Sequence, residues 1–342
     1  MKKFVNWIMA MFGVMFTMRQ QLFADVQTTL TEGLSAEMKT FYDMTLIDEA
    51  APALVHDQFG QKRPIPKNGG KTIEFRKFSP LTKALTPLTE GVTPQGKSLD
   101  VTTITAEVSQ YGDYVTMSDM LELTAIDNVV VEALKLLGRQ GGATLDTVVR
   151  NILHTGTNVM YCPKVAEVGS ETAVTSRSAL DNTCRLTVKQ IQKAVAKLRA
   201  QNAPPISGKY VAIIHPYAAY DLMREPEWID AHKYAQPDNL FEGEIGEIAG
   251  VRFVQTTEAK IYEGGIFGTL IFGQNAYGVT EIAGGGMETI VKQKGSAGTA
   301  DPLDQRSSVG WKGQKTAEIL VEQYMVRVES MSPDFSAGLA AN

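Results

Sequence analysis

One segment of the sequence has the residue types and spacing of a phosphate-binding loop. Residues 91–98 (GVTPQGKS) match the pattern GxxxxGK[ST], in which backbone N–H groups and a lysine hold the phosphates of a nucleotide. Such a loop works between a buried strand and a helix, because the helix N-terminus points at the phosphate. Here TPLTE precedes Gly91, Pro94 lacks an N–H, and the residues after Lys97 alternate as in a strand. We therefore interpret the segment as a hairpin tip and keep a nucleotide-binding enzyme only as an alternative.

The remaining reactive side chains do not assemble a recognisable site. The histidines at 56, 154, 215 and 232 are scattered, and HExxH, GxSxG and CxxC motifs are absent from the sequence. Cys162 and Cys184 lack metal-site spacing and favour two free thiols. His215 precedes Pro216 and favours a helix cap, and the cluster at 242, 244 and 247 favours a solvated acidic loop. The sequence names no catalytic, metal or cofactor-binding residue and predicts a protein that is not an enzyme.

Composition narrows the class of protein further. The chain has 342 residues, of which 44% are hydrophobic, enough for one large or two moderate domains with their own cores. Its net charge of −5 argues against a nucleic-acid reader that depends on a basic face.

The N-terminal residues allow two interpretations. Lys2 and Lys3 precede an apolar run over residues 4–18, and Ala24 could precede a cleavage point, as in a signal peptide. Residues 19–21 (RQQ) and Leu22 fit that pattern poorly. We prefer an apolar arm over residues 1–30 that docks on neighbouring chains. An exported surface or adhesion protein is the alternative.

The centre of the chain predicts a projecting hairpin followed by a long helix. Residues 71–78 and 101–117 alternate as strands, with a change of face near Tyr111 and Gly112 that suggests a bulge. Between them, residues 79–100 are rich in proline and glycine and too sparse in apolar residues to form a core. A capping box at Thr124 begins a predicted helix that runs to about Leu153, roughly 40 Å long. Its glycines at 138, 141 and 142 require either a closely packed backbone or a bend.

The other predicted elements give an α+β class. Helices are expected over residues 35–50, 187–201 and 217–224, and a loop-like insertion with a short hairpin over 154–186. Strands are expected over residues 210–215, 251–256, 269–272, 277–282, 287–292 and 317–329.

Three sequence blocks stand out within this order of elements: SAEMKTFYD (residues 35–43), LVHDQFGQKRPIPKNGGKTIEFRKFSPL (54–81) and SQYGDYVTMSDMLELTAIDN (109–128). By these blocks and the order of its elements, the sequence resembles the major capsid proteins of tailed double-stranded-DNA bacteriophages, and most of all the podovirus N-four-like family. The resemblance implies a Hong Kong 97-type fold with an N-terminal arm and short helix (1–53) and an extended-loop hairpin with its base strands (54–118). A spine helix with the following insertion (119–186, peripheral domain) and an axial domain with returning peripheral strands (187–342) complete it.

The resemblance also implies a function without catalysis or cofactor. Chains would form pentamers and hexamers of an icosahedral shell around double-stranded DNA, bound without sequence preference. Scaffolding, portal and decoration proteins would be the partners, and the virion capsid, after the host cytoplasm, the location. An encapsulin-like cargo shell shares the fold and stays an alternative.

Physical reasoning and the resemblance predict the same contacts between subunits. A hairpin without its own core is stable only against another surface. We expect such contacts from Pro87, Leu88, Glu90, Gly91, Pro94 and Lys97 of the hairpin, and from Phe4, Trp7, Phe12, Leu22 and Phe23 of the arm.

Overall fold

A computed structural model describes most of the chain after residue 45. It covers residues 46, 49–50, 54–78, 81–88, 90–93, 95–125, 129–167, 170–235, 246–283, 286–296 and 301–342. The predicted arm lies outside these residues. The predicted helix over 35–50 is described only at Leu46, Glu49 and Ala50, which are helical.

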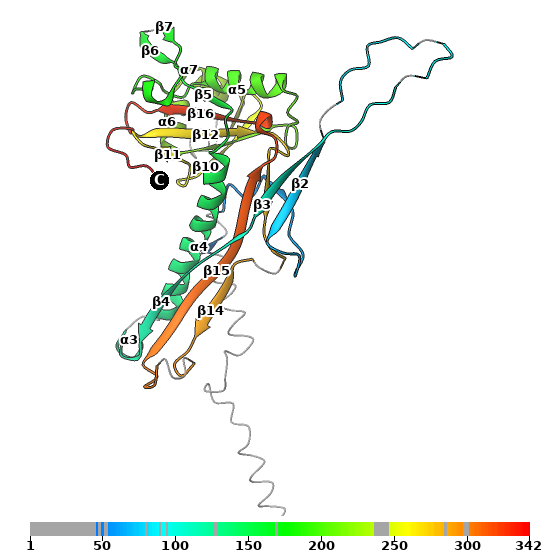
Figure 1. Cartoon of the computed structure of the whole chain (residues 1–342). Helices are drawn as coiled ribbons and strands as arrows, with labels where there is room; N and C mark the ends of the chain where they lie inside the picture. Colours follow the sequence, from blue (N-terminus) through cyan, green and yellow to red (C-terminus); the bar gives the residue numbers. More distant parts are fainter. Residues whose placement is uncertain are drawn as a thin grey trace, which may run out of the picture.

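Two sheets organise the described chain. The first is an elongated sheet along α4, built from β1 (Gln61–Lys62), β13 (Tyr277–Thr280), β15 (Arg306–Ile319), β14 (Glu288–Lys292) and β4 (Ser109–Ser118). The second forms the wider body at one end of α4 (Figure 1) and contains β5 (Val159–Tyr161), β16 (Met325–Met331), β12 (Ile266–Phe272), β8 (Tyr210–Ile214), β10 (Val251–Gln255), β9 (Glu247–Ile248) and β11 (Ile261–Tyr262). This mixture of helices and sheets confirms the α+β class.

The long helix α4 (Val129–Leu153) connects the two sheets. Its 25 residues give a length of about 37 Å, close to the prediction. The predicted start at Thr124 is wrong. Thr124 is instead the last residue of a separate short helix, α3 (Asp119–Thr124). The Ser118 side chain caps the start of α3 by accepting a hydrogen bond from the N–H of Leu121, and Ala125 is extended at its end. Asp127, the fourth residue of the capping box predicted at Thr124, lies outside the described residues.

The glycines of α4 are explained by close packing of another backbone. A Cβ on Gly138 would lie 2.8 Å from the carbonyl oxygen of Leu46, and one on Gly142 would lie 2.5 Å from that of Ala50. Both distances are shorter than real Cβ atoms adopt. A Cβ on Gly141 would instead meet the Trp311 ring at 3.0 Å. The glycines therefore let Leu46, Ala50 and strand β15 approach α4.

The predicted hairpin is a loop with a short ladder at its base. Strands β2 (Thr72–Phe78) and β3 (Val101–Glu107) pair antiparallel over their whole length, and residues 81–100, where described, project away from both sheets (Figure 1). The predicted bulge at Tyr111 and Gly112 is wrong, because β4 pairs with β15 without a register shift. The strand breaks earlier, at Val108, where the chain leaves β2 as its partner and joins β15. This change of partner produces the change of face.

The late strands differ from the prediction at the end of the chain. Residues 317–329 are not one strand, since β15 ends at Ile319 and η4 (Glu322–Tyr324) separates it from β16. Most of β15, from Arg306 on, was not predicted, because SSVGWKGQKT gives little apolar alternation.

The insertion and the helices of the body follow the predictions closely. The insertion contains β5, the β6–β7 hairpin (Lys164–Glu167 and Ser170–Thr172) and η2 (Arg177–Ala179). Helix α5 (Val188–Ala200) and helix α6 (Pro216–Met223) lie where helices were expected, and α7 (Pro226–Ala235) was not predicted.

Candidate functional site

The segment that resembles a phosphate-binding loop lies in the extended loop, defined here as residues 78–101. The described residues after Gly96 are extended and enter β3 rather than a helix. The Lys97 ammonium donates to the opposite limb, at 3.0 Å to the backbone oxygen and 2.6 Å to the hydroxyl of Thr82. Without a helix N-terminus the segment cannot converge on a phosphate. The segment therefore lacks the geometry of a phosphate-binding loop.

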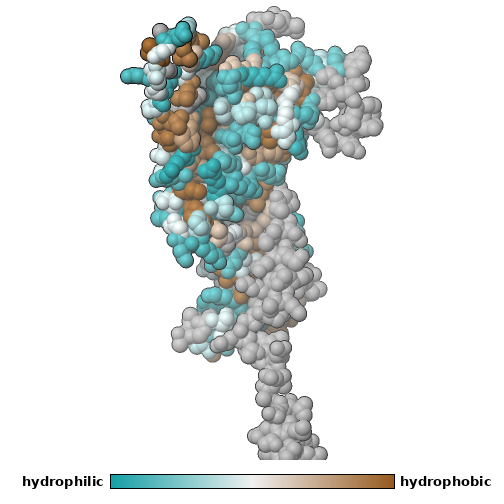
Figure 2. All heavy atoms as spheres, turned by 90° about the vertical axis from the view of Figure 1, so that its right-hand side faces the viewer, coloured by the Kyte–Doolittle hydropathy of each residue, from teal (hydrophilic) through white to brown (hydrophobic). Residues whose placement is uncertain are grey.

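The extended loop exposes an unusual amount of apolar surface. Leu85 is 83% and Leu88 77% exposed, and the loop carries further exposed apolar side chains at Phe78, Leu81, Val92, Leu99 and Val101. The face toward which the loop projects has hydrophobic patches between hydrophilic ones (Figure 2). Clusters of this kind mark contact surfaces in soluble proteins.

The predicted contact residues divide into two groups. Pro87, Leu88, Glu90, Gly91 and Lys97 all lie on the projecting part of the loop and are exposed. Pro94 and the arm residues Phe4, Trp7, Phe12, Leu22 and Phe23 lie outside the described residues. Their contacts with other chains stay predictions.

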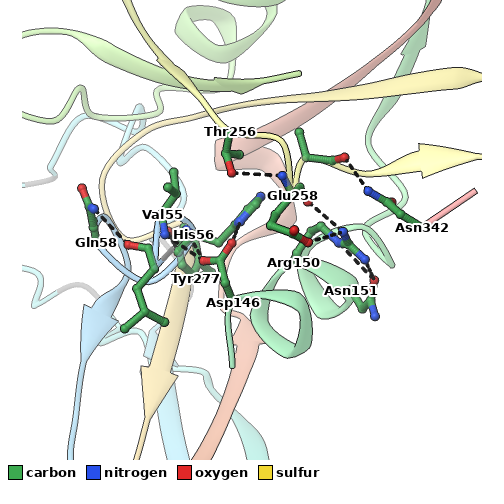
Figure 3. A network of polar contacts seen from close by, with 12 residues as sticks. Val55, His56, Gln58, Asp146, Arg150, Asn151, Thr256, Glu258, Tyr277 and Asn342 are labelled. Atoms are coloured by element: carbon green, nitrogen blue, oxygen red, sulfur yellow. Dashed lines mark hydrogen bonds and ion pairs between the residues drawn. The ribbon is translucent and has the colours of Figure 1, made fainter. Parts of the chain in front are cut away.

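A buried polar network holds the segment that leads into the loop (Figure 3). Asp146 of α4 accepts hydrogen bonds from the backbone N–H groups of Val55 and His56 at 2.9 and 2.7 Å, and its second oxygen lies 2.7 Å from His56 Nδ1. The Tyr277 hydroxyl donates to the carbonyl of His56 at 2.6 Å. Sequence reasoning missed this network. The only sequence feature that pointed to this network was Asp146 among the apolar residues of the predicted long helix.

A second buried network fixes the insertion to the body. Glu329 of β16 is fully buried and accepts hydrogen bonds from Arg177 Nε at 2.7 Å and from Arg327 Nε at 2.9 Å. Arg177 also lies 3.6 Å above the ring of Tyr262. The hydrogen bond to Glu329 raises the pKa of Arg177. The two arginines compensate the charge of the buried carboxylate with charge-assisted hydrogen bonds.

The other candidate residues have structural roles. His215 caps α6, accepting from the N–H of Tyr217 at 3.2 Å, as predicted. Cys162 and Cys184 are free and buried, and burial raises the pKa of both thiols. Glu247 pairs with Lys209, whereas Glu242 and Glu244 lie outside the described residues.

The described residues hold neither a metal cluster nor a membrane-spanning helix. Within them, no three His, Cys, Asp or Glu side chains are grouped to hold a metal ion. None of the helices in the same part of the chain is long and apolar enough to cross a membrane.

Comparison with known protein families identifies the family to which this chain belongs. The family model described as "Phage capsid protein" matches residues 101–325. The chain belongs to the phage capsid protein family. Its role is structural, as a major capsid subunit, and its place is the virion capsid. A comparison with curated protein sequences gives no significant match.

Solved phage capsids have the same fold at low sequence identity. The capsid of cyanophage P-SCSP1u is 15% identical over 90% of this chain and 94% of that chain, with a TM-score of 0.63. The cyanophage Pam1 capsid is 15% identical over 91% and 99%, with a TM-score of 0.61. The capsid of Ralstonia phage GP4 is 13% identical over 91% and 97%, with a TM-score of 0.60. The predicted Hong Kong 97-type fold and capsid function are thus confirmed. The N-four-like subfamily stays a prediction.

Proposed function

We propose that the chain forms rings of five and six subunits which close into an icosahedral shell around double-stranded DNA, and that the extended loop is a principal contact between subunits. The observation that carries this proposal is the loop itself, which projects from the fold with its leucines in solvent. Within the described part of the chain, these side chains have no surface to pack on. A second copy of the chain would.

The size of the apolar surface supports the proposal. Burying one leucine side chain is favourable by about 1.5–3 kcal/mol, so covering even Leu85 and Leu88 would contribute several kcal/mol per contact. In a closed shell the same contact would recur for every subunit, so these free energies would add up to a stable particle.

The partners and the division of the chain belong to the same proposal. We infer an arm over residues 1–53, a loop region over 54–118, a spine region over 119–186 and an axial region over 187–342. Scaffolding, portal and decoration proteins are the expected partners, and DNA is expected to be held without sequence preference. Assembly would take place in the host cytoplasm, without any catalytic step by this chain. An encapsulin-like shell differs only in cargo, and the match to the phage family favours the genome.

The test changes the loop without touching the core. Leu85 and Leu88 are largely in solvent, so the double substitution Leu85→Ser and Leu88→Ser should leave the fold and its unfolding midpoint unchanged. We expect purified variant subunits to stay unassembled under conditions in which the native chain gives particles, as followed by light scattering and electron microscopy. Deletion of residues 87–98 should do the same. Normal particles from both variants would show that the loop is not a principal contact.

A further inference from the structure

The two cysteines of the chain lie at the two ends of one segment of the insertion. The β6–β7 segment, defined here as residues 163–183, leaves the second sheet after Cys162 and returns to it at Cys184. It contains β6, β7 and η2 and projects beyond the sheet (Figure 1). Lys164 and Asp181 form an ion pair at 2.7 Å, one at each end of the segment. The two ends of the segment therefore meet next to the sheet.

The backbone of β16 places the two cysteines side by side. The N–H of Cys162 donates to the carbonyl of Glu329 at 3.0 Å and continues the parallel pairing of β5 with β16. In a regular parallel ladder, the carbonyl of Cys162 would then accept from the N–H of Met331. The carbonyl of Cys184 accepts from that N–H instead, at 2.9 Å. Cys184 thus takes the next position beside β16, close enough for the α-carbon separation of about 4.4–6.8 Å that a disulfide requires.

Both thiols lie in the same apolar core. Cys162 and Cys184 are 0% exposed and belong to the cluster between α5 and the second sheet. Burial raises the pKa of the Cys162 thiol, and the nearby Cys184 adds to the rise. The sulfur of Cys184 lies 3.5 Å from Oδ1 of Asp181, which is partly exposed, so Cys184 is the thiol nearer the surface. Because the thiolate is the nucleophile, both cysteines are unreactive while the segment is closed.

The β6–β7 segment is attached to the body mainly by polar contacts. Over residues 163–165 and 171–183, where the burial of its side chains is described, every residue is exposed or half-buried. Its strongest contact is the pair of hydrogen bonds from Arg177 to the buried carboxylate of Glu329. A segment with few buried apolar side chains can open while the rest of the protein stays folded. Such opening would expose both thiols to solvent.

We propose that Cys162 and Cys184 form a disulfide when the β6–β7 segment opens in the presence of a small organic disulfide, and that this bond fastens the two ends of the segment together. The Cys184 thiolate attacks one sulfur of the small disulfide and releases one thiol, which leaves a mixed disulfide on Cys184. The Cys162 thiolate then attacks the Cys184 sulfur and releases the second thiol. The two cysteines lose two protons and two electrons, and the small disulfide is reduced to two thiols.

The chemistry of this pair does not require a shell. Only its timing rests on the proposed function, because the cytoplasm keeps thiols reduced. A shell assembled there would contain both thiols free and would gain the bond in an oxidising medium. The bond would keep the insertion closed on the second sheet.

The experiment measures the thiol–disulfide equilibrium of the unassembled, full-length subunit in mixtures of reduced and oxidised glutathione. The chain has 2 cysteines, so an internal disulfide can only join this pair. We expect both free thiols to disappear, with a mass loss of two hydrogen atoms and no retained glutathione. The native subunit should keep the bond in mixtures about tenfold more reducing than the chain unfolded in urea does, because the fold holds the two cysteines together.

Single substitutions test the two steps separately. Cys162→Ser should accumulate a glutathione adduct on Cys184, and Cys184→Ser should react about tenfold more slowly. The proposal would be overturned by a native chain that keeps glutathione adducts instead of closing the bond, or by dimers linked through cysteine. An internal bond that is no more favourable in the native subunit than in the unfolded chain would also overturn it. Equal reaction rates of the two variants would overturn the order of attack.

A matched pair of variants tests the opening of the segment. Arg177→Ala removes the hydrogen bonds to Glu329, so we expect the disulfide to form about tenfold faster. Lys209→Ala removes a surface ion pair with Glu247, outside the β6–β7 segment, and should leave the rate unchanged. Equal acceleration in both variants, or none in Arg177→Ala, would overturn the role of opening. Because all these measurements use unassembled subunits, they decide the proposal even if the chain forms no shells, which would refute the proposed function separately.

Discussion

Gly142→Ala tests how closely Ala50 packs against α4. Alanine in place of glycine inside a helix is favourable by about 1 kcal/mol when nothing opposes it. At Gly142 the new Cβ would lie 2.5 Å from the carbonyl oxygen of Ala50 and 3.0 Å from its Cα. Both opposing atoms belong to the backbone, so Ala50 must move by most of an ångström. Leu46 and Ala50 are 0% and 2% exposed, so this movement disturbs well-packed residues.

The sign of the change in the free energy of unfolding shows whether Ala50 packs closely against Gly142. Overpacking costs about 1–3 kcal/mol, so we expect Gly142→Ala to lower the free energy of unfolding by up to about 2 kcal/mol in spite of its better helix propensity. Urea unfolding of the unassembled subunit measures it. Ala143→Gly, at the next and less buried position, calibrates the propensity and should cost about 1 kcal/mol. If Gly142→Ala instead stabilised the protein by that amount, Ala50 would not be packed against α4.

The other predictions concern two buried charge sites and the loop lysine. Burial lowers the pKa of His154 well below its usual 6.5, so the unfolded chain binds a proton that the folded chain does not. Stability should fall by about 1.4 kcal/mol per pH unit as pH drops below 6.5 toward the lowered pKa, and urea titrations should show a weaker pH dependence in His154→Gln. Arg177→Ala, which leaves Glu329 with one arginine, should cost about 1–3 kcal/mol and speed protease cleavage in the insertion, unlike Lys189→Ala at a surface pair. Equilibrium dialysis with ATP should detect no binding to the native chain; binding lost in Lys97→Ala would contradict the loop geometry.

The elements with regular patterns could be predicted from sequence. The long helix ending at Leu153, the strand over residues 71–78 and the helix over residues 187–201 were each predicted within a few residues. Elements whose sequence lacks a pattern could not. Strand β15 is the example: Gly310 and Gly313 leave room for Tyr114 and Leu145, and they interrupt the apolar pattern of its core residues Val309 and Trp311.

The candidate site could be predicted only in part. The projection of residues 79–100 followed from their lack of a core, which is a local property of the sequence. The Asp146 network could not be found in this way, because it joins residues 90 or more positions apart. The sequence showed that the apolar residues change to the other face of the strand after Val108. It could not show the cause, which is that the chain pairs with β2 before Val108 and with β15, roughly two hundred residues away, after it.

The most direct test of the account is the size of the particles that the purified chain forms. We expect light scattering and electron microscopy of the native chain, with a scaffolding protein added if needed, to show closed shells or rings of five and six subunits. The Leu85→Ser and Leu88→Ser variant, prepared in parallel, should remain as folded, unassembled subunits. A native chain that stays monomeric or dimeric under all these conditions would contradict the shell function proposed from the loop.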